Sequence, residues 1–202
     1  MEIDILPKMA RAQIHMVFIV VPRFNIATLI TMIETLRIAN YLAPTSTFSW
    51  EVASFDGSKI IASNGMTATI KTANDNLQPA EFAFILGSWG TEHYHNQRLT
   101  AWLRKRARAG ERICGVELGS YIVARAGLLD GKLATIHWSW LNGFKENFDR
   151  VEVEESLFTL DSKVMTCSGG LAGVDLMLRL IEEMNGSSFS GEIADQMLHH
   201  PI

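Results

Sequence analysis

Apolar segments typical of strands alternate with segments of helical periodicity along this chain of 202 residues. Strands are predicted at residues 13–21, 48–55, 82–86 and 112–116. Apolar residues recur at helical spacing over residues 26–41 and 97–109. Strands that alternate with helices of this length indicate a mostly parallel sheet between two layers of helices. We therefore expect an α/β three-layer sandwich.

The rest of the chain continues this pattern in shorter pieces. Further short strands are predicted at residues 66–70, 151–153, 157–160 and 164–167. A helix is expected to end near Gly127, and another is predicted to begin after Ser168-Gly169-Gly170 and to run through Met184. Residues 187–198 are compatible with one more short amphipathic helix.

Charge and hydropathy exclude several classes of protein. A net charge of −4 argues against a large nucleic-acid-binding surface, because such surfaces need clustered Lys and Arg. The densest basic run, residues 104–108, is expected on the solvent-exposed face and C-terminal end of helix 97–109, where cations complement the helix dipole. No apolar run approaches the roughly 20 residues that span a bilayer, and no signal-peptide pattern is present. We expect a cytoplasmic protein without membrane contact.

The cysteines and histidines give no pattern of a metal centre. Cys114 and Cys167 lie in apolar segments predicted as strands, without a C-x-x-C or Cys/His ligand spacing. His199 and His200 have no Asp, Glu or Cys partner at ligand spacing. We therefore expect reduced core thiols, no metal site and no cofactor.

The most informative motif runs from Gly115 to Gly119, with the sequence GVELG, between an apolar strand and a predicted helix. This is the spacing of a nucleophile elbow, a strained turn that presents its central side chain at the carboxyl end of the sheet. Open α/β folds bind their ligands at that end. Serine or cysteine at the centre would be an acyl-transfer nucleophile, but this chain has Glu117. Alternatively, Glu117 is simply a first-turn carboxylate that the helix dipole favours.

Two further motifs follow the elbow, AGLLDG at residues 126–131 and ATIHW at residues 134–138. With the elbow they resemble the ThiJ/PfpI-like domain at the N-terminus of AraC-type regulators of the GlxA-like family. The resemblance covers about residues 14–186, including residues 34–40 and 166–170. It implies a flavodoxin-like fold of the ThiJ/PfpI superfamily, a homodimer and a small-molecule effector.

The resemblance also implies a domain organisation. Residues 1–186 would form the ligand-sensing domain, and residues 187–202 would start a linker to a C-terminal helix-turn-helix domain that is absent from this chain. Promoter DNA would be bound only through that absent domain.

The resemblance further implies that catalysis is lost. In catalytic relatives, a cysteine at the elbow is supported by an acid from the first helix and often by a histidine. The matching positions here are Glu117, Thr28 and His137, so two of the three groups are missing. Cys114 lies inside the strand and cannot replace the nucleophile. We expect a non-catalytic sensing domain; the alternatives are a hydrolase-like or lyase-like enzyme that uses Glu117 and His137, and a purely structural dimerisation module.

Candidate ligand-binding residues belong to the elbow, to the start of the first helix or to segments that follow strands. They are Asn25, Thr28, Ser88, Trp89, Glu117, Leu118, His137 and Trp138. A partly desolvated carboxylate beside Trp89 or Trp138 would suit an ammonium or quaternary ammonium group. The family branch that the chain most resembles senses choline-derived, carnitine-derived or amino-acid-derived metabolites. Core packing for the tryptophans, a backbone contact for His137 and a hydrogen-bonded Glu117 are the alternatives.

Overall fold

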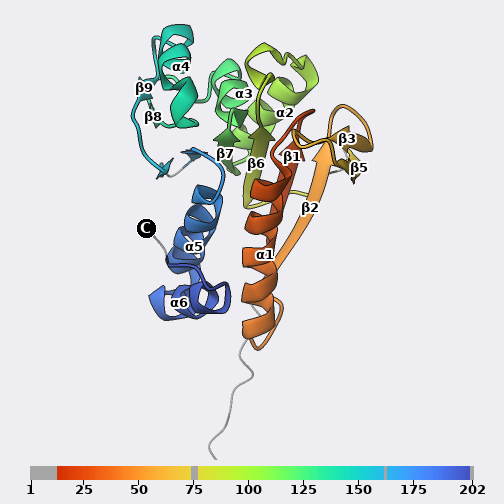
Figure 1. Ribbon diagram of the computed structural model, residues 1–202, viewed down its shortest axis with the longest axis vertical. Coiled ribbons are helices and arrows are strands. Elements are labelled where there is room, and N and C mark those ends of the chain that lie inside the picture. The colour runs from red at the N-terminus through yellow and green to blue at the C-terminus, as the bar shows by residue number, and fades with distance from the viewer. Residues whose placement is uncertain (1–12, 74–76, 162, 201–202) are drawn as a thin grey trace, which may run out of the picture.

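The computed structural model describes residues 13–73, 77–161 and 163–200, and its centre is a seven-stranded sheet (Figure 1). The strand order is β10-β11-β7-β6-β1-β2-β5. The strands are β1 (Ile14–Val20), β2 (Phe48–Ser54), β5 (Lys71–Thr72), β6 (Phe82–Gly87), β7 (Arg112–Glu117), β10 (Phe158–Thr159) and β11 (Val164–Cys167). Neighbouring strands pair in parallel, except that β10 runs antiparallel to β11. The prediction of a mostly parallel sheet is confirmed.

Helices cover both faces of the sheet. One apolar cluster joins the sheet to α1 (Ile26–Leu42), α5 (Ala172–Asn185) and α6 (Ser187–Gln196), and a second joins it to α2 (Gln97–Arg108), α3 (Gly119–Arg125) and α4 (Leu141–Asn147). Along β1, Met16 and Phe18 enter the first cluster, whereas Val17 and Ile19 enter the second. The three-layer α/β architecture is therefore as predicted. Over the described ranges, no helix is long and apolar enough to cross a membrane.

Two short strand pairs lie outside the central sheet. β3 (Lys59–Ile61) pairs with β4 (Thr67–Thr69) in an antiparallel hairpin, and β8 (Leu133–Ala134) pairs in parallel with β9 (Glu152–Val153). β4 and β9 confirm the strands predicted at residues 66–70 and 151–153, whereas β3 and β8 were not predicted. The 3-10 turns η1 (Thr91–His93) and η2 (Trp138–Trp140), like α4, were not anticipated. Elements of two to seven residues are too short to give a clear period, because a helical period needs a window of 11 residues or so.

The burial of Arg106 corrects the prediction that the whole basic run of residues 104–108 is exposed to solvent. Arg104, Lys105 and Arg108 are exposed, but Arg106 is buried. Its guanidinium pairs with Glu111 at 2.5 Å and donates to the main-chain oxygens of Leu77 (2.7 Å) and Gln78 (2.9 Å). The helical period alone cannot show this, because the loop that Arg106 anchors is distant in sequence.

α6 extends the folded unit beyond the boundary predicted at residue 186. The helix packs against α1 and α5, and its residues Ser190, Ile193 and Ala194 are buried. Ser190 donates its hydroxyl to the carbonyl oxygen of Leu178 at 2.8 Å. The first ten residues of the predicted linker are thus an integral part of the domain. Residues 201–202 of that linker lie outside the described residues, and the following DNA-binding domain stays a prediction.

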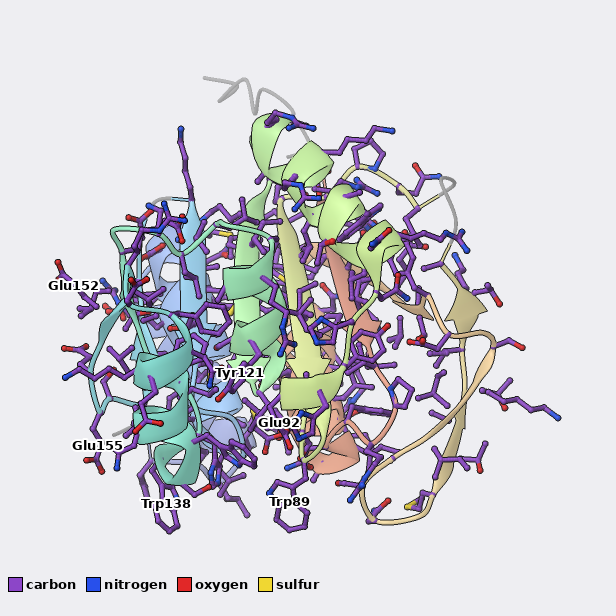
Figure 2. The ribbon with its side chains drawn as sticks, turned by 90° about the horizontal axis from the view of Figure 1, so that it is seen from above. Trp89, Glu92, Tyr121, Trp138, Glu152 and Glu155 are labelled. Carbon is purple, nitrogen blue, oxygen red and sulfur yellow. The ribbon has the colours of Figure 1, made fainter. Side chains whose placement is uncertain are left out.

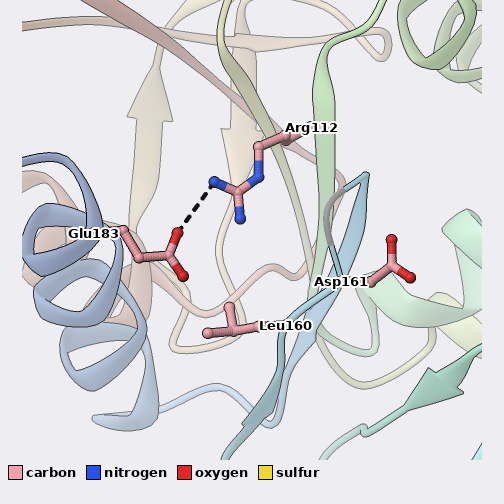
Figure 3. Close-up of a pocket in the computed structure, with 4 residues that line it drawn as sticks. All are labelled: Arg112, Leu160, Asp161 and Glu183. Atoms are coloured by element: carbon pink, nitrogen blue, oxygen red, sulfur yellow. Dashed lines mark hydrogen bonds and ion pairs between the residues drawn. The ribbon is translucent and has the colours of Figure 1, made fainter.

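A cavity of about 380 Å³ opens near the start of β7, at the opposite end of this strand from Glu117 (Figure 3). Arg112, Leu160, Asp161 and Glu183 line it. The Arg112 guanidinium lies 3.4 Å from Glu183 and stacks on Phe82, and Asp161 pairs with Lys132 at 3.0 Å. The charged groups around this cavity are therefore already paired within the protein.

We expect Ile193→Ala to lower the free energy of unfolding by about 2–5 kcal/mol, because this fully buried side chain joins α6 to the core. Leu198→Ala is the matched control, since that leucine is 92% exposed and should change stability by less than about 0.5 kcal/mol. Urea denaturation of both variants gives the comparison. Equal stabilities would mean that α6 does not contribute to the fold.

Candidate ligand-binding site

The turn from β7 to α3 has the backbone geometry of an elbow. Glu117 adopts a φ of 53°, in the left-handed region that costs a residue other than glycine about 1–2 kcal/mol. The end of β6 holds this turn: Gly87 is the register partner of Glu117, and the Leu118 amide donates to the Gly87 carbonyl at 3.2 Å. Such local strain persists only where the surrounding structure fixes it, and it is commonest at functional sites.

The two glycines of the motif are required because the main chains pass very close together. A Cβ atom at Gly119 would lie 1.8 Å from the carbonyl oxygen of Ile85. A Cβ atom at Gly115 would lie 2.7 Å from the Cα of Ser120. Main-chain atoms cannot move aside as a flexible side chain can. This spacing supports the elbow interpretation of the motif over a chance glutamate in a first helical turn.

The side chain of Asn25 points its Nδ2 group at the elbow, because its Oδ1 atom already accepts hydrogen bonds at the start of α1. The oxygen caps α1 by accepting hydrogen bonds from the amides of Ala27 (3.1 Å) and Thr28 (3.4 Å). The Nδ2 group then donates to Oε1 of Glu117 at 3.0 Å. Ser88, directly after β6, also forms a side-chain hydrogen bond with Glu117.

The turn between β11 and α5 forms a third side of the site. A Cβ atom at Gly169 would lie 2.0 Å from Cγ of Glu117, so only glycine fits there, and its φ of 90° also favours glycine. The next amide, Gly170, donates to Oγ1 of Thr28 at 3.0 Å. Thr28 therefore connects α1 to this turn. The candidate site residues named from the sequence do not include this turn. The adjacent glycines Gly169 and Gly170 were the signal that could have identified it.

Glu117 is a buried carboxyl whose hydrogen-bond partners among the described residues are neutral. Its side chain and backbone together are 7% exposed. Burial raises the pKa of Glu117 above its ordinary value, while the hydrogen bonds from Asn25 and Ser88 act in the opposite direction. No charged group in the described part of the chain contributes to the shift. The site can therefore hold a neutral carboxyl that donates a hydrogen bond, or a carboxylate that a cationic group would stabilise.

The candidate tryptophans project outward near this end of the sheet. Trp89 is 59% exposed and Trp138 is 70% exposed, and Figure 2 shows both rings on the same side of the molecule. Trp140 instead packs edge-on against Tyr121, at 6.4 Å between ring centres. Trp89 and Trp138 thus remain available to a ligand, whereas Trp140 has a packing role.

Leu118 and His137 have local partners. Leu118 is 1% exposed and packs in the apolar cluster with α3, and its contact with a ligand stays a prediction. His137 caps η2: its Nδ1 lies 2.8 Å from Oγ of Ser139 and accepts from the Ser139 amide at 3.4 Å. This contact is with an amide and a hydroxyl, not with the backbone carbonyl that the alternative for His137 supposed, and a role in the pocket stays a prediction.

Neither cysteine has the properties of a nucleophile. Cys114 and Cys167 are both free and completely buried. Burial raises the pKa of the Cys114 thiol, and it raises that of Cys167 to about 12. A thiol needs its thiolate form to attack an electrophile. In the segments that the structure describes, no cluster of three or more His, Cys, Asp or Glu residues could hold a metal ion.

Comparisons with known proteins agree with the sequence resemblance. The model of the DJ-1/PfpI family matches residues 17–183. The HTH-type transcriptional regulator CdhR of Pseudomonas aeruginosa is 33% identical over 181 residues, which are 90% of this chain and 54% of the relative. This chain thus spans about half the length of that relative. A shorter match, 28% identical over 100 residues (50% of this chain and 43% of the relative), is to isonitrile hydratase of Pseudomonas putida.

A solved structure supports the fold. The crystal structure of an AraC family transcriptional regulator from Pseudomonas putida superimposes with a TM-score of 0.84 at 21% identity. The superposition covers 91% of this chain and 99% of that chain. The α/β flavodoxin-like architecture is therefore shared.

Glu117→Gln should gain stability relative to the wild type as the pH rises. A carboxyl whose pKa is raised by folding stabilises the native state below its unfolded pKa, and it loses this contribution as the pH rises through the folded pKa. Glutamine cannot ionise. The unfolding free energy of the variant minus that of the wild type should therefore increase as the pH rises above the ordinary pKa of glutamate.

Urea denaturation between about pH 4 and pH 8 measures this difference. Glu155→Gln, which removes an exposed carboxylate, is the control and should give a nearly constant difference. A constant or decreasing difference for Glu117→Gln would show that folding does not raise the pKa of Glu117.

Proposed function

This chain belongs to the DJ-1/PfpI family, and we propose that it is a non-catalytic, small-molecule-sensing domain of an AraC-type transcription regulator. The observation that carries the proposal is Glu117, a buried carboxyl at the centre of an elbow whose catalytic form needs a nucleophile. The similarity to a named transcription regulator over 90% of the chain supports the regulatory part.

The local contacts support loss of catalysis. Thr28 stands where catalytic relatives have an acid, and its hydroxyl accepts a hydrogen bond from Gly170. Nδ1 of His137 interacts with Ser139. An enzyme of the same scaffold, hydrolase-like or lyase-like, is the alternative, and the raised pKa of Glu117 is the observation that favours it, because a general acid must hold its proton. Turnover of candidate substrates would decide for the enzyme.

The ligand that this site suits best carries an ammonium or quaternary ammonium group. Glu117 has no cationic partner among the residues that the structure describes, so a ligand cation would offset the cost of its burial. The exposed ring of Trp89 would add a cation–π contact of about 0.5–2 kcal/mol. Choline-derived, carnitine-derived and amino-acid-derived metabolites have this chemistry.

Arg23 supplies a positive charge beside Gly90, the residue that follows Trp89. Its Nη1 atom lies 3.9 Å from the position that a Cβ atom at Gly90 would occupy, and its own backbone is left-handed, with a φ of 65°. A guanidinium binds a carboxylate through two parallel hydrogen bonds. A ligand with both a cationic group and a carboxylate would therefore suit Glu117 and Arg23 together.

The proposed regulator acts as a homodimer in the cytoplasm. Promoter DNA would be bound by a helix-turn-helix domain that follows the sensing domain. Two such domains in a dimer would match the paired half-sites that are typical of these DNA sites. The effector would bind only at the sensing domain.

We expect calorimetry to detect binding of at least one of four probes to the wild-type chain: choline, carnitine, glycine betaine and arginine. Glu117→Gln should weaken that binding tenfold or more, equivalent to about 1.4 kcal/mol, and Glu155→Gln should leave it unchanged. Arg23→Gln should weaken the binding of glycine betaine more than that of choline, which has no carboxylate.

The outcomes separate the parts of the proposal. If no probe binds the wild type, the cationic ligand class is wrong. If Glu117→Gln binds a probe as well as the wild type does, the carboxyl does not recognise the cation.

We further expect residues 1–202 alone to show no sequence-specific binding to duplex DNA. The net charge is −4, and Arg106 of the densest basic run is buried in an ion pair with Glu111. A mobility-shift assay at two salt concentrations tests this expectation. Specific, salt-sensitive binding would place the DNA-binding surface within this domain.

A further inference from the structure

The segment that joins β6 to α2 determines what lies opposite Glu117. We call residues 87–94 the rim loop; it contains Ser88, which hydrogen-bonds to Glu117, and the exposed Trp89. The loop then forms η1 and reaches Tyr94. A ligand that contacts both Glu117 and Trp89 depends on the distance between the elbow and this loop.

Arg125 holds the rim loop at several points. Its Nη1 donates to the carbonyl oxygens of Thr91 (3.1 Å) and Tyr94 (2.9 Å), and its Nη2 donates to the carbonyl oxygen of Glu92. The guanidinium also lies over the ring of Tyr121, 5.5 Å from its centre. One side chain thus binds three main-chain oxygens of a single 3-10 turn.

Arg125 belongs to the helix that follows the elbow. α3 begins at Gly119, two residues after Glu117, and Arg125 is its last residue. The helix is packed tightly at its start, because a Cβ atom at Gly119 would meet the carbonyl of Ile85 at 1.8 Å. The same short helix therefore fixes the elbow at one end and the rim loop at the other.

We propose that Arg125 is a positioning residue, which sets the rim loop with Ser88 and Trp89 at its working distance from Glu117. The role of this distance in recognition rests on the proposed ligand-sensing function; the positioning itself does not. Arg125 touches no ligand in this proposal and acts through the loop.

Close packing within the loop transmits the position of η1 to the residues at the site. A Cβ atom at Gly87 would lie 2.6 Å from Oγ1 of Thr91, and the Gly90 amide donates to Oε2 of Glu92 at 2.8 Å. A displacement of η1 therefore moves Ser88 and Trp89 with it. Lysine cannot replace Arg125, because a single ammonium lacks the planar set of donors that reaches three carbonyls.

Arg106 provides a matched control for Arg125. It also donates to main-chain oxygens of a loop, those of Leu77 and Gln78, and its guanidinium stacks on Trp102 at 4.8 Å. That loop precedes β6, whereas the rim loop follows it. Arg106→Lys should therefore lower stability without changing the rim loop.

The test is a heteronuclear NMR comparison of the full 202-residue chain as wild type, Arg125→Lys and Arg106→Lys. The reporters are the indole N–H of Trp89, assigned with Trp89→Phe, and the amides of Ser88 and Glu117. Arg125→Lys should shift or broaden all three signals, and Arg106→Lys should leave them in place. Unchanged signals in Arg125→Lys, or equal changes in both variants, would overturn the proposal.

A measurement on the wild type covers the case in which Arg125→Lys does not fold. Held by three carbonyls, the guanidinium of Arg125 should give resolved, slowly exchanging Nη–H signals. Averaged signals in fast exchange with water would overturn the proposal. Neither measurement uses a ligand, so failure of the positioning role can be distinguished from failure of the proposed sensing function.

Discussion

The close approach of main chains at the elbow is the constraint on which the site depends. Glu117 can adopt its left-handed backbone only because Gly119 passes against the Ile85 carbonyl and Gly115 passes against Ser120. The strain of that turn is maintained by the adjoining strands, which are buried and fully paired. The consequence is a side chain whose direction is fixed before any ligand arrives, which lowers the entropy lost on binding.

Prediction from sequence succeeded where the signal was local. The alternation of strands and helices gave the sheet, and the spacing of Gly115 and Gly119 around Glu117 gave the elbow, because each depends on residues close together in the chain. The sides of the site were harder. Asn25 and Gly169 reach Glu117 across 92 and 52 positions of sequence, and no periodicity encodes such contacts.

The same distinction explains what the local pattern could not show. Leu118 belongs to the elbow motif, and its side chain is buried in the core directly after the left-handed residue Glu117. Arg106 lies in a basic run typical of an exposed helix end, yet a distant loop covers it. Arg125 comes directly before the AGLLDG motif, and its three carbonyl partners lie in or directly after a 3-10 turn too short to predict. In each case tertiary contacts override the local pattern.

Under the proposed function, Glu117 would link the stability of this domain to the occupancy of its site. Hydrogen bonds from Asn25 and Ser88 only partly offset the burial of the carboxyl, so its ionised form destabilises the empty protein. A bound cation would remove that cost in the folded state alone, and any ligand that binds only the folded state raises its stability. A glutamine at this position would relieve the cost permanently and leave the ligand less to gain. Under the proposed function, the buried carboxyl would lower the stability of the empty domain and make the domain more responsive to its effector.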